Sequence, residues 1–248
     1  MSRKIFHRLV PLSKVLDIIS EYYELKPLGT EEVDLANALG RVLAKDIYSP
    51  IDHPPFDRSS VDGYAVRSVD VAGAEEYNPK TLEIIGRVSA GDEPVVEVEP
   101  GKAVEIATGA MIPRGTDSVV MEEYTSREEN KLFVYRSAVA GENITTTGSD
   151  ISLGDLVLVK GTILGSNEIG LLAGLGINRV SVYKKPRIAV FSTGNEVVEP
   201  GNKLKPGKVY DVNGYLVTTA LREYGARAEY LGKIPDNYNI LYLSLIHI

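Results

Sequence analysis

The segment 54–66, PPFDRSSVDGYAV, gathers side chains that are suited to chemistry at a high density. Two carboxylates, one guanidinium and three hydroxyls surround a single glycine, Gly63, directly after a Pro-Pro pair that favours extended backbone. Burying so many polar groups is costly and a surface turn does not require them, so a binding or catalytic site is one interpretation. A polar turn between two strands is the other.

Four further segments place acids, hydroxyls and glycines where the chain turns: 107–123, 141–151, 187–197 and 207–213. Glycines beside Thr108 and Thr193 leave backbone N–H groups open to an oxyanion, with the threonine hydroxyl as an additional donor. Carboxylates in such segments supply the hard oxygen ligands that suit Mg²⁺. Anionic phosphates and oxyanions need such donors and cations before they can approach each other.

Together with the approach segment 35–57, these motifs resemble in order and spacing those of the molybdopterin molybdenumtransferase family, the MoeA-like enzymes and the E domain of gephyrin. The resemblance extends over roughly residues 10–236. It implies a role in molybdenum cofactor biosynthesis, in which molybdate or tungstate is inserted into adenylylated molybdopterin and AMP is released. A non-catalytic, gephyrin-like scaffold or pterin carrier is the alternative. Acids retained at several separate motif positions favour the enzyme.

The resemblance also implies roles for individual residues. The catalytic set is Asp62, Thr108, Glu196 and Asp150, and Asp236 is the implied metal ligand for Mg²⁺. The substrate-binding set is Ser60, Gly63, Tyr64, Gly109, Thr193, Gly194, Asp211 and Asn213. A purely structural role is the alternative for these residues: Asp62 would cap a turn, and Thr108 with Gly109 would form an ordinary β-turn. Around Asp150 the sequence lacks the basic residues of many family members, which weakens a phosphate-gripping role for that loop.

Composition restricts the partners. The net charge of −7 argues against nonspecific nucleic-acid binding, which requires basic patches to neutralise phosphates. No apolar run approaches the roughly 20 residues of a membrane span, and the absence of cysteine fits a reducing compartment, so we expect a cytoplasmic protein with no membrane partner. The resemblance implies a homodimer with sites at the subunit boundary.

The elements that must position these motifs follow from hydrophobic periodicity. Apolar residues within 12–23 recur at helical spacing, which predicts an amphipathic helix with Ser13 as a possible N-cap. A second short helix is expected over 36–43. From Thr81 the period changes to two, which predicts a small antiparallel lobe with strands within 81–88, 94–100, 101–109, 117–124 and 131–137.

A strand, a helix and another strand are expected over 155–183. The continuous apolar run 188–191 predicts a buried parallel strand. Apolar residues at helical spacing within 216–224, followed by Gly225, predict a helix, and 228–231 is expected to form the return strand. Glu196 lies in the loop of about twenty residues after the first strand, and ligands bind at that edge of open α/β sheets.

We therefore expect a multidomain α+β protein. An elongated mixed domain, 1–49 plus 143–184, carries a β-rich inserted lobe, 50–142, and is followed by a truncated α/β molybdopterin-binding domain, 185–248. The truncation is inferred because the family pattern stops after Asn237, before the glycine-rich loop that binds the pterin phosphate. The chain alone is accordingly expected to be inactive.

Overall fold

The computed structural model describes residues 10–22 and 26–246 and shows a mixed, strand-rich chain with few helices, as the fold class predicts in its broad form. The described residues form two compact units. The first lies within 1–45, 160–169 and 178–248, and the second comprises 46–159 and 170–177. The three-domain boundaries expected from the sequence stay a prediction.

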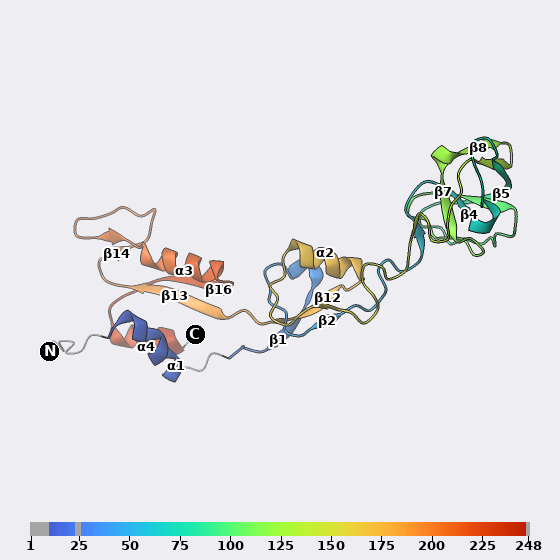
Figure 1. Ribbon diagram of the computed structural model, residues 1–248. Coiled ribbons are helices and arrows are strands. Elements are labelled where there is room, and N and C mark those ends of the chain that lie inside the picture. The colour runs from blue at the N-terminus through green and yellow to red at the C-terminus, as the bar shows by residue number, and fades with distance from the viewer. Residues whose placement is uncertain (1–9, 23–25, 247–248) are drawn as a thin grey trace. The chain divides into compact units, whose positions relative to one another are not determined.

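A six-stranded sheet forms the centre of the second unit (Figure 1). Its strand order is β7-β4-β6-β5-β9-β8. The strands are β4 (Gly63–Val66), β5 (Lys80–Val88), β6 (Lys102–Ile106), β7 (Ser118–Met121), β8 (Thr125–Glu128) and β9 (Lys131–Val134).

Strand β4 lies between β6 and β7 and is buried along its whole length. Because side chains alternate along a strand, Tyr64 and Val66 enter one apolar cluster and Ala65 enters another. The chemical motif at 54–66 therefore ends in the best-packed strand of this unit.

The prediction for the lobe was wrong at two points. The lobe is not wholly antiparallel, because β5 and β6 run parallel. Residues 94–100 form no strand. Proline at positions 94 and 100 removes two backbone donors, so no ladder forms along this run. Val98 still packs into a core cluster and its N–H donates to the carbonyl of Arg114, whereas Val95 is 96% exposed.

Two short antiparallel pairs complete the second unit. Strand β3 (Arg58–Ser59) pairs with β10 (Ile144–Thr145), and β2 (Ile47–Tyr48) pairs with β11 (Leu156–Leu158). The first pair joins the motif at 54–66 directly to the motif at 141–151.

In the first unit, β1 (Thr30–Asp34) pairs antiparallel with β12 (Arg179–Tyr183). Helix α1 (Val15–Tyr22) confirms a predicted helix, but Ser13 is no N-cap, because it lies inside a 3₁₀ turn that begins at Leu12. Helix α2 (Ser166–Gly174), whose residues are divided between the first and second units, confirms another. The helix expected at 36–43 is wrong. The residues Leu35–Asn37 form a single 3₁₀ turn and the helix does not continue. Gly40 has a left-handed φ of 68°, and Leu43 forms a β-bridge with Val182.

The predicted βαβ unit is confirmed. Strand β13 (Arg187–Thr193) runs parallel to β16 (Arg227–Ile234), and α3 (Asn213–Glu223) connects them and packs on both. The long loop contains a small parallel pair, β14 (Val197–Val198) with β15 (Val209–Tyr210). The last residues, which resembled no family continuation, form α4 (Tyr238–Ile246).

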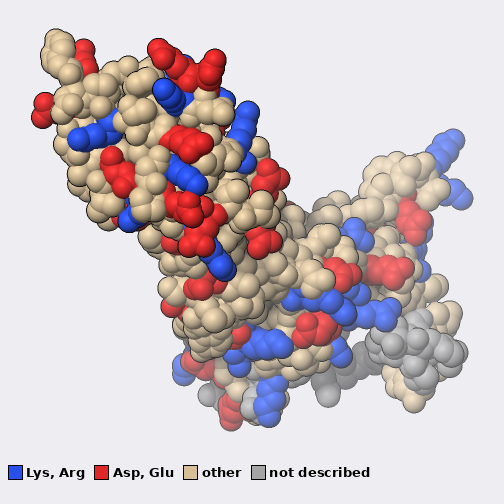
Figure 2. Space-filling model, turned by 90° about the vertical axis from the view of Figure 1, so that its right-hand side faces the viewer, with Lys and Arg blue, Asp and Glu red and all other residues tan. Residues whose placement is uncertain are grey.

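Basic and acidic side chains are interspersed over the face of the molecule in Figure 2. Among the helices of the described residues, none is both long and apolar enough to cross a membrane.

Candidate functional site

The structure brings the motif at 54–66 together with the motif at 107–123. Asp62 lies one residue before β4, and its Oδ1 accepts a hydrogen bond of 2.8 Å from the backbone N–H of Thr108. The N–H of Gly109 donates to the carbonyl of Ser59 at 2.8 Å. Two loops separated by about fifty residues are therefore held side by side by backbone groups as well as by a carboxylate.

Asp62 and Thr108 keep unused hydrogen-bonding capacity. Both residues are exposed, and within the described part of the chain Asp62 Oδ2 and the Thr108 hydroxyl make no hydrogen bond. One carboxylate oxygen of Asp62 holds the loop, and the described residues use neither the other oxygen nor the Thr108 hydroxyl. This pair is a ready acceptor and donor for a polar ligand.

Other predicted residues of this motif have structural partners. Tyr64 is 6% exposed and belongs to a core cluster, and burial, with Glu105 nearby, raises the pKa of its phenol. Gly63 lies against the carbonyl of Val120, where a side chain has no room. Ser60 contacts Thr145, with 2.8 Å between their hydroxyl oxygens. Substrate binding by these three residues stays a prediction.

Asp150 lies in the same unit with an exposed side chain. Its N–H donates to the carbonyl of His53 at 3.1 Å, so backbone pairing fixes the loop without using the carboxylate. A carboxylate outside the predicted site residues, Asp57, also holds this segment. Asp57 Oδ1 accepts from both the N–H and the hydroxyl of Thr147, each at 2.7 Å. The run of three threonines at 145–147 was the available signal.

The Asp57 contact makes stability depend on pH. Hydrogen bonds from the N–H and then the hydroxyl of Thr147 lower the pKa of Asp57. A lowered folded-state pKa stabilises the fold above the unfolded value of about 3.9, and this contribution is lost as pH falls through the folded value. Wild type should have a higher Tm than Asp57→Asn near neutral pH, and this difference in Tm should decrease as the pH falls below about 4. Thermal denaturation between acidic and neutral pH measures it, and a gap that is constant with pH contradicts the assignment.

A second group of motif residues gathers at the carboxyl edge of the parallel strands in the first unit. Thr193 ends β13 and pairs in register with Ile234, the last residue of β16. Glu196 and Asp236 follow these strands by three and two residues, and both have exposed side chains. Glu196 lies in the loop after β13, as the sequence predicts, and Asp236 follows β16, so both acids lie at the edge where open α/β sheets bind ligands.

Two lysines at this edge were missed by sequence reasoning. Lys233 Nζ donates to the carbonyl of Val197 at 2.8 Å, and Lys208 Nζ donates to the carbonyl of Asn195 at 2.8 Å. They hold the loop that carries Gly194 and Glu196 and place positive charge beside it. Lys208 lies within the motif 207–213, so its position was the available signal.

The Asp211 carboxylate holds the first turn of helix α3. Asp211 is 5% exposed, and its carboxylate accepts from the Tyr230 hydroxyl at 2.5 Å and from the Gly214 N–H at 2.9 Å. Burial raises the pKa of Asp211, but hydrogen bonds from Ser192, Tyr230 and Gly214 outweigh it and leave the pKa lowered. Asn213 is the exposed first residue of α3. Substrate binding by these two residues stays a prediction.

Metal binding depends on whether enough ligands are grouped together. Across residues 10–22 and 26–246, no three His, Cys, Asp or Glu residues are grouped so that they could hold a metal ion. The acids at the carboxyl edge, Glu196 and Asp236, nevertheless match the donor chemistry of Mg²⁺, which commonly takes one or two carboxylates and completes its shell with water and substrate phosphates.

The comparisons with known proteins agree with the motif pattern. The family model for the MoeA N-terminal region (domain I and II) matches residues 10–176. A molybdopterin molybdenumtransferase from a Nostoc species is 36% identical over 239 residues, covering 94% of this chain and 55% of the relative. The corresponding enzyme from Bacillus subtilis is 41% identical over 211 residues, covering 84% of this chain and 49% of the relative.

Solved structures give the same result. Two crystal structures of molybdopterin biosynthesis MoeA proteins from Pyrococcus horikoshii each match 97% of this chain. One has a TM-score of 0.84 at 43% identity over 61% of its own chain, and the other has 0.85 at 38% identity over 64%. The chain spans about half the length of the curated relatives that it matches. Motifs, fold and relatives therefore agree that the chain belongs to the MoeA family, whose N-terminal region corresponds to residues 10–176.

Proposed function

We propose that the protein to which this chain belongs is a molybdopterin molybdenumtransferase of molybdenum cofactor biosynthesis. Its substrates would be adenylylated molybdopterin and molybdate or tungstate, and AMP would be released. The observation that carries this proposal is the contact between Asp62 and Thr108, which joins two family motifs and leaves a carboxylate oxygen and a hydroxyl that no other described residue uses. Relatives named as transferases favour the enzyme over a scaffold or carrier.

The carboxyl edge of β13 and β16 supplies the chemistry that a phosphoanhydride requires. Thr193, at the end of β13, offers a hydroxyl for a phosphate oxygen, and Lys208 and Lys233 place positive charge nearby. Mg²⁺, held by Glu196 and Asp236 together with substrate phosphates, would neutralise the charge on the departing AMP. Gly194 is buried with a φ of 135°, and a Cβ there would lie 3.0 Å from both carboxylate oxygens of Glu196, so glycine allows this acid to lie against the strand end.

The two groups of motif residues belong to different compact units, with Asp62 and Thr108 in one and Glu196 and Asp236 in the other. We propose that a homodimer completes the site, each subunit contributing residues from one group. In this arrangement the pterin-binding domain is the α/β part that begins near residue 185, and the β lobe is an insertion in the elongated domain. A cytoplasmic location fits the substrates of such an enzyme.

Asp62→Asn in the full gene product tests the proposal. The substitution removes the anionic oxygen at nearly constant shape, and we expect AMP release from adenylylated molybdopterin, with molybdate and Mg²⁺, to fall about 10- to 100-fold. The melting temperature should change little, because an amide oxygen can still accept from the Thr108 N–H.

Asp70→Asn is the matched control. Asp70 Oδ2 also accepts a backbone N–H, from Gly101 at 2.9 Å, in the same unit but outside the motifs. AMP release should be unchanged in this variant. Wild-type activity in Asp62→Asn, or an equal loss in Asp70→Asn, would reject the assignment of Asp62.

A further inference from the structure

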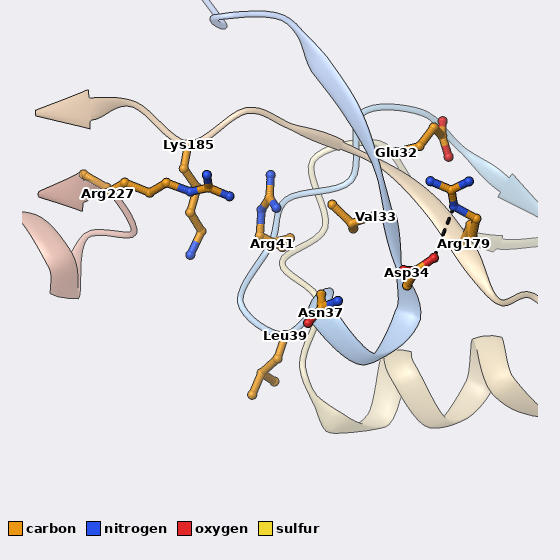
Figure 3. Close-up of a pocket in the computed structure, with 10 residues that line it drawn as sticks. Glu32, Val33, Asp34, Asn37, Leu39, Arg41, Arg179, Lys185 and Arg227 are labelled. Atoms are coloured by element: carbon orange, nitrogen blue, oxygen red, sulfur yellow. Dashed lines mark ion pairs between the residues drawn. The ribbon is translucent and has the colours of Figure 1, made fainter.

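A pocket of about 530 Å³ lies in the first unit at the amino ends of the parallel strands (Figure 3). Lys185 precedes β13 by two residues and Arg227 is the first residue of β16, so both lie at the edge opposite to Glu196 and Asp236. Strand β1 and the turn after it form another wall, which includes Arg41. The pocket is thus separate from the site described above.

The charges that line this pocket are unbalanced. Four cations, Arg41, Arg179, Lys185 and Arg227, face two acids, Glu32 and Asp34. Both acids have partners: Asp34 pairs with Arg179 at 3.3 Å, and Glu32 pairs with Lys45 at 3.6 Å.

Lys185 and Arg227 form no ion pair with any residue that the structure describes. Glu31 is close enough to Arg227 to interact with its charge, but the Glu31 carboxylate pairs with Arg41. In a chain with a net charge of −7, two cations without an acid partner on one wall are a local concentration of positive charge. Their charges are available to an anion from outside the chain.

Arg41 adds a donor that is not satisfied. Its side chain is 5% exposed, and Nη2 donates to Glu31 Oε1 at 2.5 Å and to the carbonyl of Tyr183 at 2.7 Å. Within the described residues, the buried Nε has no hydrogen-bond partner. Buried donors are rarely left unpaired because their desolvation is not repaid. The guanidinium therefore retains capacity for an acceptor that the described chain does not supply.

We propose that this pocket binds a phosphate-bearing small anion, with its phosphoryl oxygens between Arg41, Lys185 and Arg227. Arginine forks match phosphate geometry, and lysine adds a compact positive charge. The volume exceeds that of a single oxyanion and lies in the range of small-molecule sites. A neighbouring pocket of about 630 Å³ shares Arg227 and is lined by two further arginines, Arg187 and Arg222, and one acid, Glu229, so cations remain in excess beyond the phosphoryl position.

Titration calorimetry with pyrophosphate and, separately, with AMP tests the site. The test variant is Lys185→Gln with Arg227→Gln, and the matched control is Arg114→Gln with Lys131→Gln, which removes the same charge from exposed positions in the other unit. Losing charged donors should weaken binding roughly tenfold or more in the test variant and leave the control unchanged. Tighter binding of AMP than of pyrophosphate would identify a nucleotide as the ligand, and the reverse order a free phosphate; either result supports the site.

A local signal separates this pocket from anion binding at the carboxyl edge. The ¹H–¹⁵N resonance of Arg41 Nε should shift on addition of pyrophosphate to the wild-type chain, and the shift should be lost in the test variant. The proposal is overturned if the wild-type chain binds neither anion, if the test variant binds both as well as the control does, or if the Arg41 resonance stays in place at saturation.

Discussion

Gly63→Ala is expected to destabilise the six-stranded sheet by about 3 kcal/mol, because overpacking against rigid backbone atoms is not relieved by side-chain movement. A Cβ at this position would lie 2.0 Å from the carbonyl oxygen of Val120 and 2.9 Å from its carbonyl carbon. Both atoms are backbone, and β4 is hydrogen bonded to β6 on one side and β7 on the other, so no side-chain rotation removes the clash. Hydrogen exchange of the β4 and β7 amides reports the loss directly.

Gly86→Ala is the control for this experiment. Gly86 lies in β5 of the same sheet, but nothing approaches its position within 4 Å. Alanine there should change stability by less than about 1 kcal/mol. If the β4 and β7 amides exchange at similar rates in the two variants, the contact at Val120 is not rigid. The requirement for glycine at position 63 would then be attributed to ligand binding.

Asp211→Ala is expected to cost the βαβ unit about 3 kcal/mol, because hydrogen bonds to a charged group contribute strongly and their buried donors would be left unpaired. The hydroxyl of Tyr230, the N–H of Gly214 and the hydroxyl of Ser192 would all lose their acceptor. The substitution also removes the carboxylate that accepts an N–H from the first turn of helix α3. Hydrogen exchange of β13 and β16 amides at neutral pH measures the effect.

Tyr230 supplies an internal check on the same cluster. Burial and then the hydrogen bond to Asp211 raise the pKa of Tyr230 to about 12. Tyr230→Phe removes one of the donors but leaves no charge unpaired, so it should cost less than Asp211→Ala. Equal costs would show that the Tyr230 hydroxyl carries the whole stabilisation.

The dependence on pH has a definite sign. The pKa of Asp211 is lowered in the fold, so its contribution is present above the unfolded value of about 3.9 and is lost as pH falls through the folded value. The difference between wild type and Asp211→Ala should therefore shrink in acid. A difference that grows in acid would contradict the lowered pKa.

Much of this protein was determined by its sequence alone. The order and spacing of the motifs identified the family without a fold, because glycines, acids and hydroxyls at fixed intervals are required by a shared site rather than by local structure. The βαβ unit was also predictable. The run at 188–191 is apolar on both faces, and Gly225, with φ of 89°, ends the helix where a left-handed residue is needed.

The tertiary structure decided what local pattern could not. Residues 36–43 have helical spacing, yet Leu43 pairs with Val182 across more than a hundred residues, and that long-range pairing prevails over propensity. The same holds for the parallel pairing of β5 with β6, since strand direction depends on partners distant in sequence.

The candidate site shows the same division. Asp62 was identifiable from its motif, but its partner Thr108 was fixed only when β4 placed the two loops together. Asp211 is a predicted substrate-binding acid, and only the tertiary structure shows that its carboxylate accepts from Tyr230 and Gly214. Arg41 carried no signal at all, because an unpaired donor is a property of what surrounds a side chain. Sequence specifies which groups are present, and only packing determines which of them remain free to bind.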